Sequence, residues 1–147
     1  MAEYFAPLQN VDLNSDIDFT ASIPCTKGCI YHEDGTGIFI LRGITNNCFA
    51  RYQVTFNGNI AVPTGTAGPI AVAISVNGEP RLSSRAIVTP ADVEEYNNVT
   101  STAIITVPKG CCFSVAVRAV SGLTTTNGTP APTISVINSG LDITRIA

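Results

Sequence analysis

The chain lacks several residue types that common functions need. Its 147 residues include no tryptophan, and only 13% are charged, against a usual share of about 25%. Eight Lys and Arg against eleven Asp and Glu exclude the basic surface of a general nucleic-acid-binding protein. No apolar run approaches the roughly 18 residues of a membrane span, so we expect no membrane partner. A hydrophobic content of 45% also excludes a disordered tail.

A single histidine, His32, restricts enzymatic chemistry. The sequence has no Gly-x-Ser-x-Gly elbow, and the glycine-rich stretch 65–68 lacks the Lys-Ser/Thr of a phosphate-binding loop. We expect His32 to be a polar residue at a strand end or in a loop. An enzyme would instead need His32, Glu33 and an acid from another strand around one cavity. We therefore predict a protein that is not an enzyme, with no catalytic residue and no cofactor.

The acidic segment 12–18 has oxygen ligands at alternate positions, as at the start of a calcium loop. The pattern fails at its sixth position, where Ile17 replaces the glycine of the sharp turn, and at its twelfth, where Ile23 replaces the bidentate glutamate. We therefore expect no calcium site here.

Five cysteines stand at positions 25, 29, 48, 111 and 112. Cys25-x₃-Cys29 with the adjacent pair Cys111-Cys112 could be drawn as a four-thiolate zinc site, but the spacing is not the usual Cys-x₂-Cys. The first five residues are acidic and carry no apolar export segment. We expect reduced, buried cysteines that act as small hydrophobes, and no metal.

The residues that are abundant favour β-structure. The chain has 16 Ile, 13 Val and 17 Thr against 6 Leu, and β-branched side chains pack well on a pleated sheet. Apolar and polar residues alternate over 52–56, 70–76, 103–107, 113–119, 134–136 and 141–144. Short alternating runs with turn residues between them predict an all-β sandwich or barrel. Only 89–95 has helix-start signals, enough for little more than one or two turns, and we expect it to be a connector between strands.

Three Asn-Gly pairs mark candidate hairpin turns, because Asn and Gly accept the positive φ angles of a type I′ turn. They are Asn57-Gly58, Asn77-Gly78 and Asn127-Gly128. Each is either a two-residue hairpin turn or, alternatively, a loop tip or a bulge inside a long strand.

Residues 1–24 carry scattered apolar side chains without clean alternation. We predict that they form an extended N-terminal anchoring arm, followed by one domain over 25–147. Tyr4, Phe5 and Leu8 are the expected anchoring residues, because exposed apolar side chains on an irregular arm require a docking groove. Deletion of residues 1–20 should then leave a folded domain that no longer docks.

Three motifs carry a resemblance that covers residues 28–147. They are GPIAVAISVNG over 68–78, VPKGCCFSVAV over 107–117 and NSGLDITRIA over 138–147. The chain resembles the TNF/C1q-like jelly-roll family found in bacteriophage and bacterial surface proteins. The resemblance implies a jelly-roll β-sandwich that assembles as a homotrimer. The trimer-packing faces would be the small side chains on two strands: Ala71, Ala73, Ser75, Ser114 and Ala116.

The resemblance implies a structural virion protein of the capsid-decoration or head-fibre type. It would be made in the host cytoplasm, lie on the capsid surface, and contact sister subunits and the major capsid protein or another virion protein. The absence of a Gly-X-Y stalk repeat favours a self-standing module. The alternative is a receptor- or glycan-binding fibre tip, or a bacterial spore or cell-surface domain, with specificity in the loop 122–132. The missing tryptophan counts against a glycan site.

Overall fold

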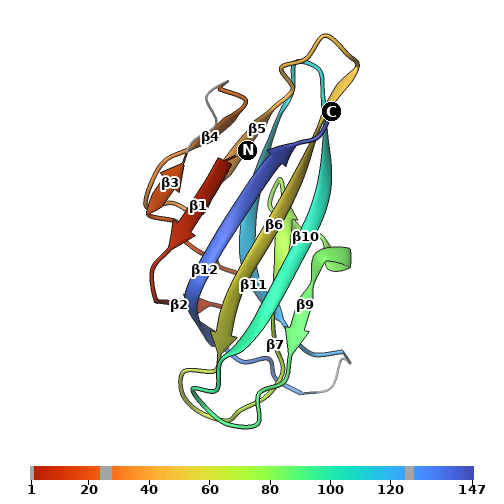
Figure 1. Ribbon diagram of the computed structural model, residues 1–147. Coiled ribbons are helices and arrows are strands. Elements are labelled where there is room, and N and C mark those ends of the chain that lie inside the picture. Colours follow the sequence, from red (N-terminus) through yellow and green to blue (C-terminus); the bar gives the residue numbers. More distant parts are fainter. Residues whose placement is uncertain (1, 24–27, 125–127) are drawn as a thin grey trace.

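A computed structural model describes residues 2–23, 28–124 and 128–147 as an all-β protein (Figure 1). The described elements follow in chain order. They are β1 (Ala2–Ala6), β2 (Gln9–Asp12), β3 (Ala21–Ile23), β4 (Ile30–His32), β5 (Phe39–Arg42), β6 (Phe49–Ala61), β7 (Ile70–Val76), β8 (Glu79–Pro80), the 3₁₀ turn η1 (Leu82–Ser84), β9 (Ala86–Val88), β10 (Asn97–Pro108), β11 (Cys112–Ser121) and β12 (Thr133–Arg145).

The strands form two antiparallel sheets that pack face to face (Figure 1). Sheet A has the order β10-β6-β12-β1-β3, with β2 also paired to β12. Sheet B has the order β4-β5-β11-β7-β8, with β9 also paired to β7. Neighbours in each sheet come from distant parts of the chain, as in Greek-key sandwiches. The predicted all-β sandwich is confirmed.

The core follows the predicted alternation. Tyr52, Val54 and Phe56 of β6 are fully buried, while their neighbours Arg51 and Gln53 are exposed. Completely buried side chains come from both sheets and include Phe39, Leu41, Ile74, Ile105, Leu141 and Ile143. Because side chains alternate across a strand, one apolar face of each sheet fills the space between the sheets and the other faces outward.

The N-terminal segment is part of the sandwich, and the prediction of an irregular arm is wrong. β1 pairs with β12 over five residues and with β3 over three. Tyr4 is only 3% exposed, and its ring packs edge-on against Phe39 of sheet B. The segment after β2 also lies along β11, where the Ile17 amide donates to the Val117 carbonyl at 2.9 Å. A domain boundary after residue 24 would therefore cut a continuous sheet.

The three Asn-Gly pairs have different outcomes. Asn77 and Gly78 have φ angles of 51° and 86° and form the two-residue turn between β7 and β8, as predicted. Asn57-Gly58 lies inside β6, beside an irregularity of β12 between Ile137 and Gly140. A Cβ on Gly58 would lie 2.7 Å from the Ser139 Cβ, so the close approach of two strands requires this glycine. Asn127 lies outside the described residues.

The segment 89–95 is a connector and not a helix. Glu95 Oε2 accepts hydrogen bonds from the amides of Ala91 and Asp92, at 2.8 and 3.0 Å. Glu94 then has a φ of 62°, which a right-handed helix does not allow. Within the described part of the chain, no helix is long and apolar enough to cross a bilayer.

Candidate functional site

No other described element covers the outward side of sheet A, which faces the viewer in Figure 1, and we call this side the open face. Its members are outward side chains of the long strands and β1: Glu3, Phe5, Arg51, Gln53, Thr55, Asn57, Thr100, Thr102, Ile104, Thr106, Asp142 and Thr144. Two of them are large and apolar. Ile104 is 54% exposed and Phe5 is 45% exposed. An uncovered face with such side chains is typical of an interaction surface.

Uncharged polar side chains join β6 and β10 across the open face. The hydroxyls of Thr55 and Thr102 are hydrogen-bonded at 2.8 Å. The Asn57 Oδ1 atom accepts from Asn98 Nδ2 at 3.0 Å and from the Thr100 hydroxyl at 3.2 Å. These bonds pair several of the polar groups of the open face with one another, which lowers the desolvation cost when a partner covers the face.

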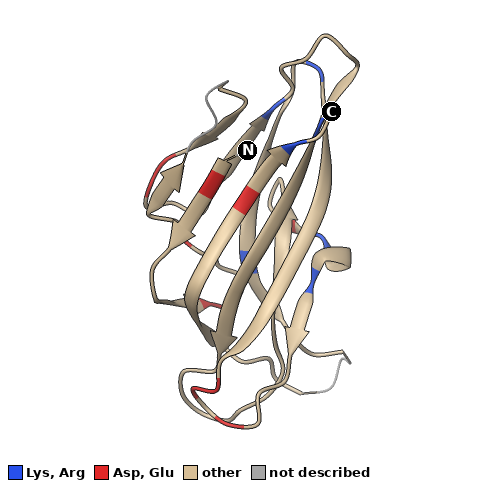
Figure 2. Ribbon diagram, viewed as in Figure 1, with Lys and Arg blue, Asp and Glu red and all other residues tan. Residues whose placement is uncertain are grey.

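The few charges of the open face are separated by sign (Figure 2). Glu3 of β1 lies directly opposite Asp142 of β12, on the same side of the sheet. Like charges opposite one another destabilise a sheet. Arg51 lies toward the other edge, with its guanidinium carbon 4.9 Å from the centroid of the Phe49 ring. The open face thus has an acidic pair, Glu3 and Asp142, and a separate basic residue, Arg51.

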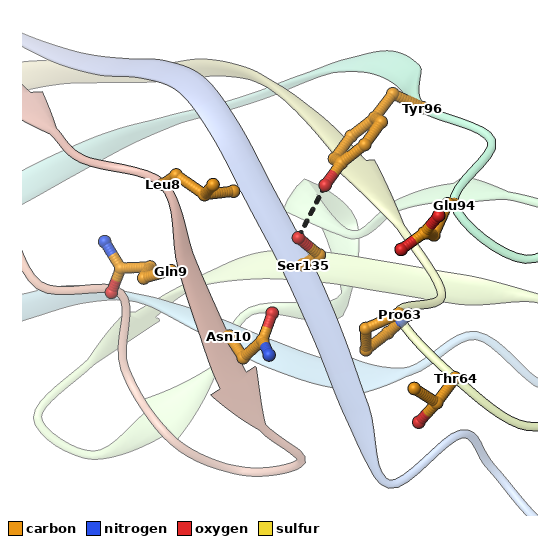
Figure 3. Close-up of a pocket in the computed structure, with 8 residues that line it drawn as sticks. All are labelled: Leu8, Gln9, Asn10, Pro63, Thr64, Glu94, Tyr96 and Ser135. Atoms are coloured by element: carbon orange, nitrogen blue, oxygen red, sulfur yellow. Dashed lines mark hydrogen bonds between the residues drawn. The ribbon is translucent and has the colours of Figure 1, made fainter.

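A cleft of about 440 Å³ opens at the end of sheet A where β2 meets β12 (Figure 3). We call it the Tyr96 cleft. Its lining residues are Leu8, Gln9, Asn10, Pro63, Thr64, Glu94, Tyr96 and Ser135. Ser135 and Asn10 are register partners on β12 and β2. The Tyr96 hydroxyl reaches over from the start of β10 and is hydrogen-bonded to the Ser135 hydroxyl at 2.7 Å.

Some polar side chains of the Tyr96 cleft are hydrogen-bonded within the protomer and others are not. The Gln9 amide belongs to the first group: its Nε2 donates to the Asp18 carbonyl at 2.9 Å and its Oε1 accepts from the Asp18 amide at 3.0 Å. The side chains of Asn10 and Glu94 have no hydrogen bond to any other described residue, and both reach toward Ser135 in Figure 3. Asn10 and Glu94 are therefore the groups available to a ligand.

The three predicted anchoring residues lie in different environments. The Tyr4 side chain is buried between the sheets, so it cannot contact a docking partner, and its assignment as an anchor is wrong. Phe5 lies on the open face, and Leu8, at 61% exposed, lies on the rim of the Tyr96 cleft. Anchoring through Phe5 and Leu8 stays a prediction.

The small residues proposed as trimer-packing faces do share one surface. Ala71, Ala73 and Ser75 of β7 lie beside Ser114 and Ala116 of β11 on the outward side of sheet B, with Ser75 opposite Ala116. However, Ala71 and Ala73 are 0% exposed and form a separate buried cluster with Val120. Because burial is already complete within the protomer, these two side chains have no area left for a sister subunit.

Residues of the neighbouring strand lie directly opposite these alanines. Val120 of β11 is the register partner of Ala71, and Arg118 is the register partner of Ala73. Arg118 donates to Asp16 Oδ1 at 3.1 Å and to the Gly78 carbonyl at 2.7 Å. Arg85, which precedes β9, donates from Nη1 to the carbonyls of Ser121 and Leu123 at 3.3 and 3.4 Å. The period-two pattern shows that the alanines face outward but not that they are already buried within the protomer.

His32 does lie at a strand end, but its ring is enclosed. Its side chain is 1% exposed and stacks on Phe39, with ring centroids 4.2 Å apart. Its Nε2 is 2.9 Å from the Thr36 carbonyl, so in the neutral ring this nitrogen carries the proton. A substrate has no open path to this ring.

The cysteine prediction holds only for Cys29, which is buried. Cys48, Cys111 and Cys112 are exposed, because they lie in or beside the loops at one end of the sandwich. Cys25 lies outside the described residues. Within the ranges that the structure describes, no three His, Cys, Asp or Glu side chains converge in a way that could hold a metal ion.

Comparison with known proteins supports the fold. No protein-family model matches the chain, and no curated protein matches it. Among solved structures, the Eiger TNF from S. frugiperda is 14% identical, with a TM-score of 0.67 over 99% of this chain and 91% of that one. The globular domain of zebrafish complement 1qA is 12% identical, with a TM-score of 0.57 over 95% and 92%. Murine APRIL is 14% identical, with a TM-score of 0.52 over 95% and 96%. The fold is therefore a TNF/C1q-like jelly roll.

Proposed function

We propose that this protein is a non-enzymatic structural protein whose jelly rolls assemble into a homotrimer through the open face of sheet A. The observation that carries the proposal is the open face itself. It is broad, mostly uncharged and internally hydrogen-bonded, and it exposes Ile104 and Phe5. Burial of apolar side chains stabilises an association, and the satisfied polar side chains between them add little cost.

The charges of the open face favour a second copy as the partner. Arg51 lies apart from the Glu3–Asp142 pair on the same surface. In a closed ring of identical subunits, each contact joins two different patches of the protomer. Arg51 of one copy can then face Glu3 and Asp142 of the next, which offsets the repulsion between the two carboxylates. A threefold ring repeats this contact three times and leaves no open end.

The proposed location is the outside of a bacteriophage capsid. It is supported by the resemblance of the motifs over 68–78, 107–117 and 138–147 to phage and bacterial surface proteins. Attachment would be through the exposed Leu8 rather than through a free arm, because β1 is needed for the sandwich and Phe5 lies on the face that the trimer would cover. The partner would be the major capsid protein or another virion protein.

Light scattering of the purified protein tests the assembly. The proposal predicts a molar mass three times the 15.4 kDa of the chain. A mass of one chain at micromolar concentration would contradict it. The location is tested separately, by mass spectrometry of purified particles and by binding of a Leu8→Ser variant to them. If particles lack the protein, the virion assignment fails while the trimer can still stand.

A further inference from the structure

We propose that the Tyr96 cleft binds a neutral saccharide. Nothing in the proposed structural role requires a ligand there, so this inference goes beyond that role. It differs from the sequence-based alternative too, which placed glycan specificity in the loop 122–132. The argument rests on the aromatic ring, the two available polar side chains and the charge of the cleft.

One wall of the cleft suits the C–H face of a sugar ring. Tyr96 is 40% exposed, and the bond from its hydroxyl to Ser135 holds the ring in one orientation. Pro63 and Leu8 add apolar surface beside it. An aromatic ring held by its own hydrogen bond presents apolar area at little entropic cost. This ring replaces the tryptophan platform that the chain lacks.

The polar side chains of the cleft suit sugar hydroxyls, each of which donates and accepts. The Asn10 amide offers donors and an acceptor, and the Glu94 carboxylate offers two acceptor oxygens to neighbouring hydroxyls. Charged acceptors make the stronger hydrogen bonds. The Thr64 hydroxyl stands at the edge of the same cleft. The cleft therefore offers donors and acceptors around the ring, with Asn10 across β12 from Tyr96 and Glu94 on the same segment as Tyr96 (Figure 3).

The backbone holds Glu94 in place before any ligand binds. Its φ of 62° is rare for a residue with a long side chain, and its amide donates to the Val62 carbonyl at 2.8 Å. Such conformations carry a local cost and gather at ligand sites. The Gln9 side chain is also held in place before a ligand binds, by its two hydrogen bonds to the backbone of Asp18. A cleft that is ordered in advance loses less entropy on binding.

The charge of the cleft selects the class of ligand. Glu94 is the one charged side chain among the eight lining residues, and no Lys or Arg is among them. A phosphate, sulfate or acidic sugar would meet a carboxylate without a compensating cation. The volume of about 440 Å³ lies in the range of small-molecule sites, about 300–1,000 Å³. A neutral monosaccharide, or one unit of a longer glycan, meets both conditions.

The test is an NMR titration of the ¹⁵N-labelled protein with glucose, galactose, mannose and N-acetylglucosamine, and with glucuronate as the acidic probe. The proposal predicts saturable shifts of the backbone amides of Asn10, Glu94 and Tyr96 with at least one neutral sugar. The expected Kd is on the order of 1 mM, typical of a weak, open site. Glucuronate should bind at least about tenfold more weakly. The absence of saturable shifts with all four neutral sugars would refute the proposal.

Variants separate a ligand site from a structural role. Tyr96→Ala should abolish the shifts, whereas Tyr96→Phe, which keeps the ring, should retain them. Tyr31→Ala is the matched control, because Tyr31 is exposed on β4 of the other sheet. The inference is wrong if Tyr31→Ala and Tyr96→Ala reduce binding equally, or if the shifting amides lie in 122–132. Light scattering of the same samples measures the oligomeric state independently of sugar binding. The proposed trimer and the proposed saccharide site can therefore be refuted separately.

Discussion

The rings of Tyr4 and Phe39 lie edge to face, with centroids 4.5 Å apart and planes at 65°. Tyr4 comes from β1 in sheet A and Phe39 from β5 in sheet B, so the contact joins the two layers. Phe19, in the segment between β2 and β3, also packs against Phe39, with ring centroids 5.4 Å apart. The first strand and the segment before β3 are therefore part of the core rather than an attachment to it.

Replacement of Tyr4 should show this directly. Tyr4→Ala removes a large buried ring, and we expect the free energy of unfolding to fall by about 3–5 kcal/mol. The matched control is Tyr31→Ala, which removes the same ring from an exposed position on β4 and should change it by less than about 1 kcal/mol. Urea denaturation measures both values. Equal effects of the two variants would contradict the place of β1 in the core.

Deletion of residues 1–20 should not leave a folded domain. The deletion removes β1 and β2, which exposes one side of β12 and the core beneath it. We expect a chain without cooperative thermal unfolding, seen by circular dichroism. A cooperative transition in the truncated protein would instead restore the idea of a dispensable arm.

Two glycines provide a test of close backbone approach. A Cβ on Gly122 would lie 2.6 Å from the Ile70 amide nitrogen, whereas a Cβ on Gly68 would meet nothing within 4 Å. Gly122→Ala should lower the free energy of unfolding by about 1–3 kcal/mol, because backbone must move. Gly68→Ala should leave it within about 0.5 kcal/mol. Chemical denaturation distinguishes them, and a neutral Gly122→Ala would mean that the contact is not tight.

A larger side chain on the outer surface of sheet B should lower the stability of the fold but leave the oligomeric state unchanged. Ala73→Leu adds volume at a position with no exposed area, so we expect a loss of about 1–3 kcal/mol in stability and an unchanged molar mass. Ala91→Leu, in an exposed connector, is the control. A dissociated but stable Ala73→Leu variant would instead revive the small residues as the subunit contact.

The sequence predicts those features that depend on local pattern. The alternation of Tyr52, Val54 and Phe56 places these residues in the core, and Asn77-Gly78 forms its hairpin turn. The segment 89–95 is a connector between strands, as predicted, but its helix-start signals produce no helical turn, because the positive φ at Glu94 prevents one from continuing.

Features that depend on long-range pairing are not visible in the pattern. The two short runs 134–136 and 141–144 belong to one strand, β12. An irregularity between Ile137 and Gly140 shifts the register of this strand and interrupts its alternation. The Tyr96 cleft combines β2, the segment before β10 and β12, and only the pairing of Asn10 with Ser135 brings them together. The prediction of Tyr4 as an exposed anchor is wrong for the same reason: the strand that pairs with β1 is β12, at the opposite end of the chain.

The charge pattern of the open face predicts a modest electrostatic contribution to assembly. Arg51→Gln should raise the dissociation constant about two- to fivefold, which corresponds to a partly exposed ion pair. Lys109→Gln removes the same charge from a loop at the same end of the sandwich and should have no such effect. Sedimentation at low salt measures both. An Arg51→Gln variant that assembles like the unaltered protein would remove the charge argument but leave the apolar one.

The central claim is that subunits pack through the open face, and light scattering of the Ile104→Arg variant tests it most directly. Ile104 is 54% exposed on β10, the strand at one edge of that face. An arginine there should leave the protomer folded but prevent close packing of the subunits. The account predicts a mass of one chain for Ile104→Arg. It predicts the unaltered, threefold mass for Ile87→Arg, a matched change on β9 of the other sheet. A threefold mass for Ile104→Arg would contradict the account.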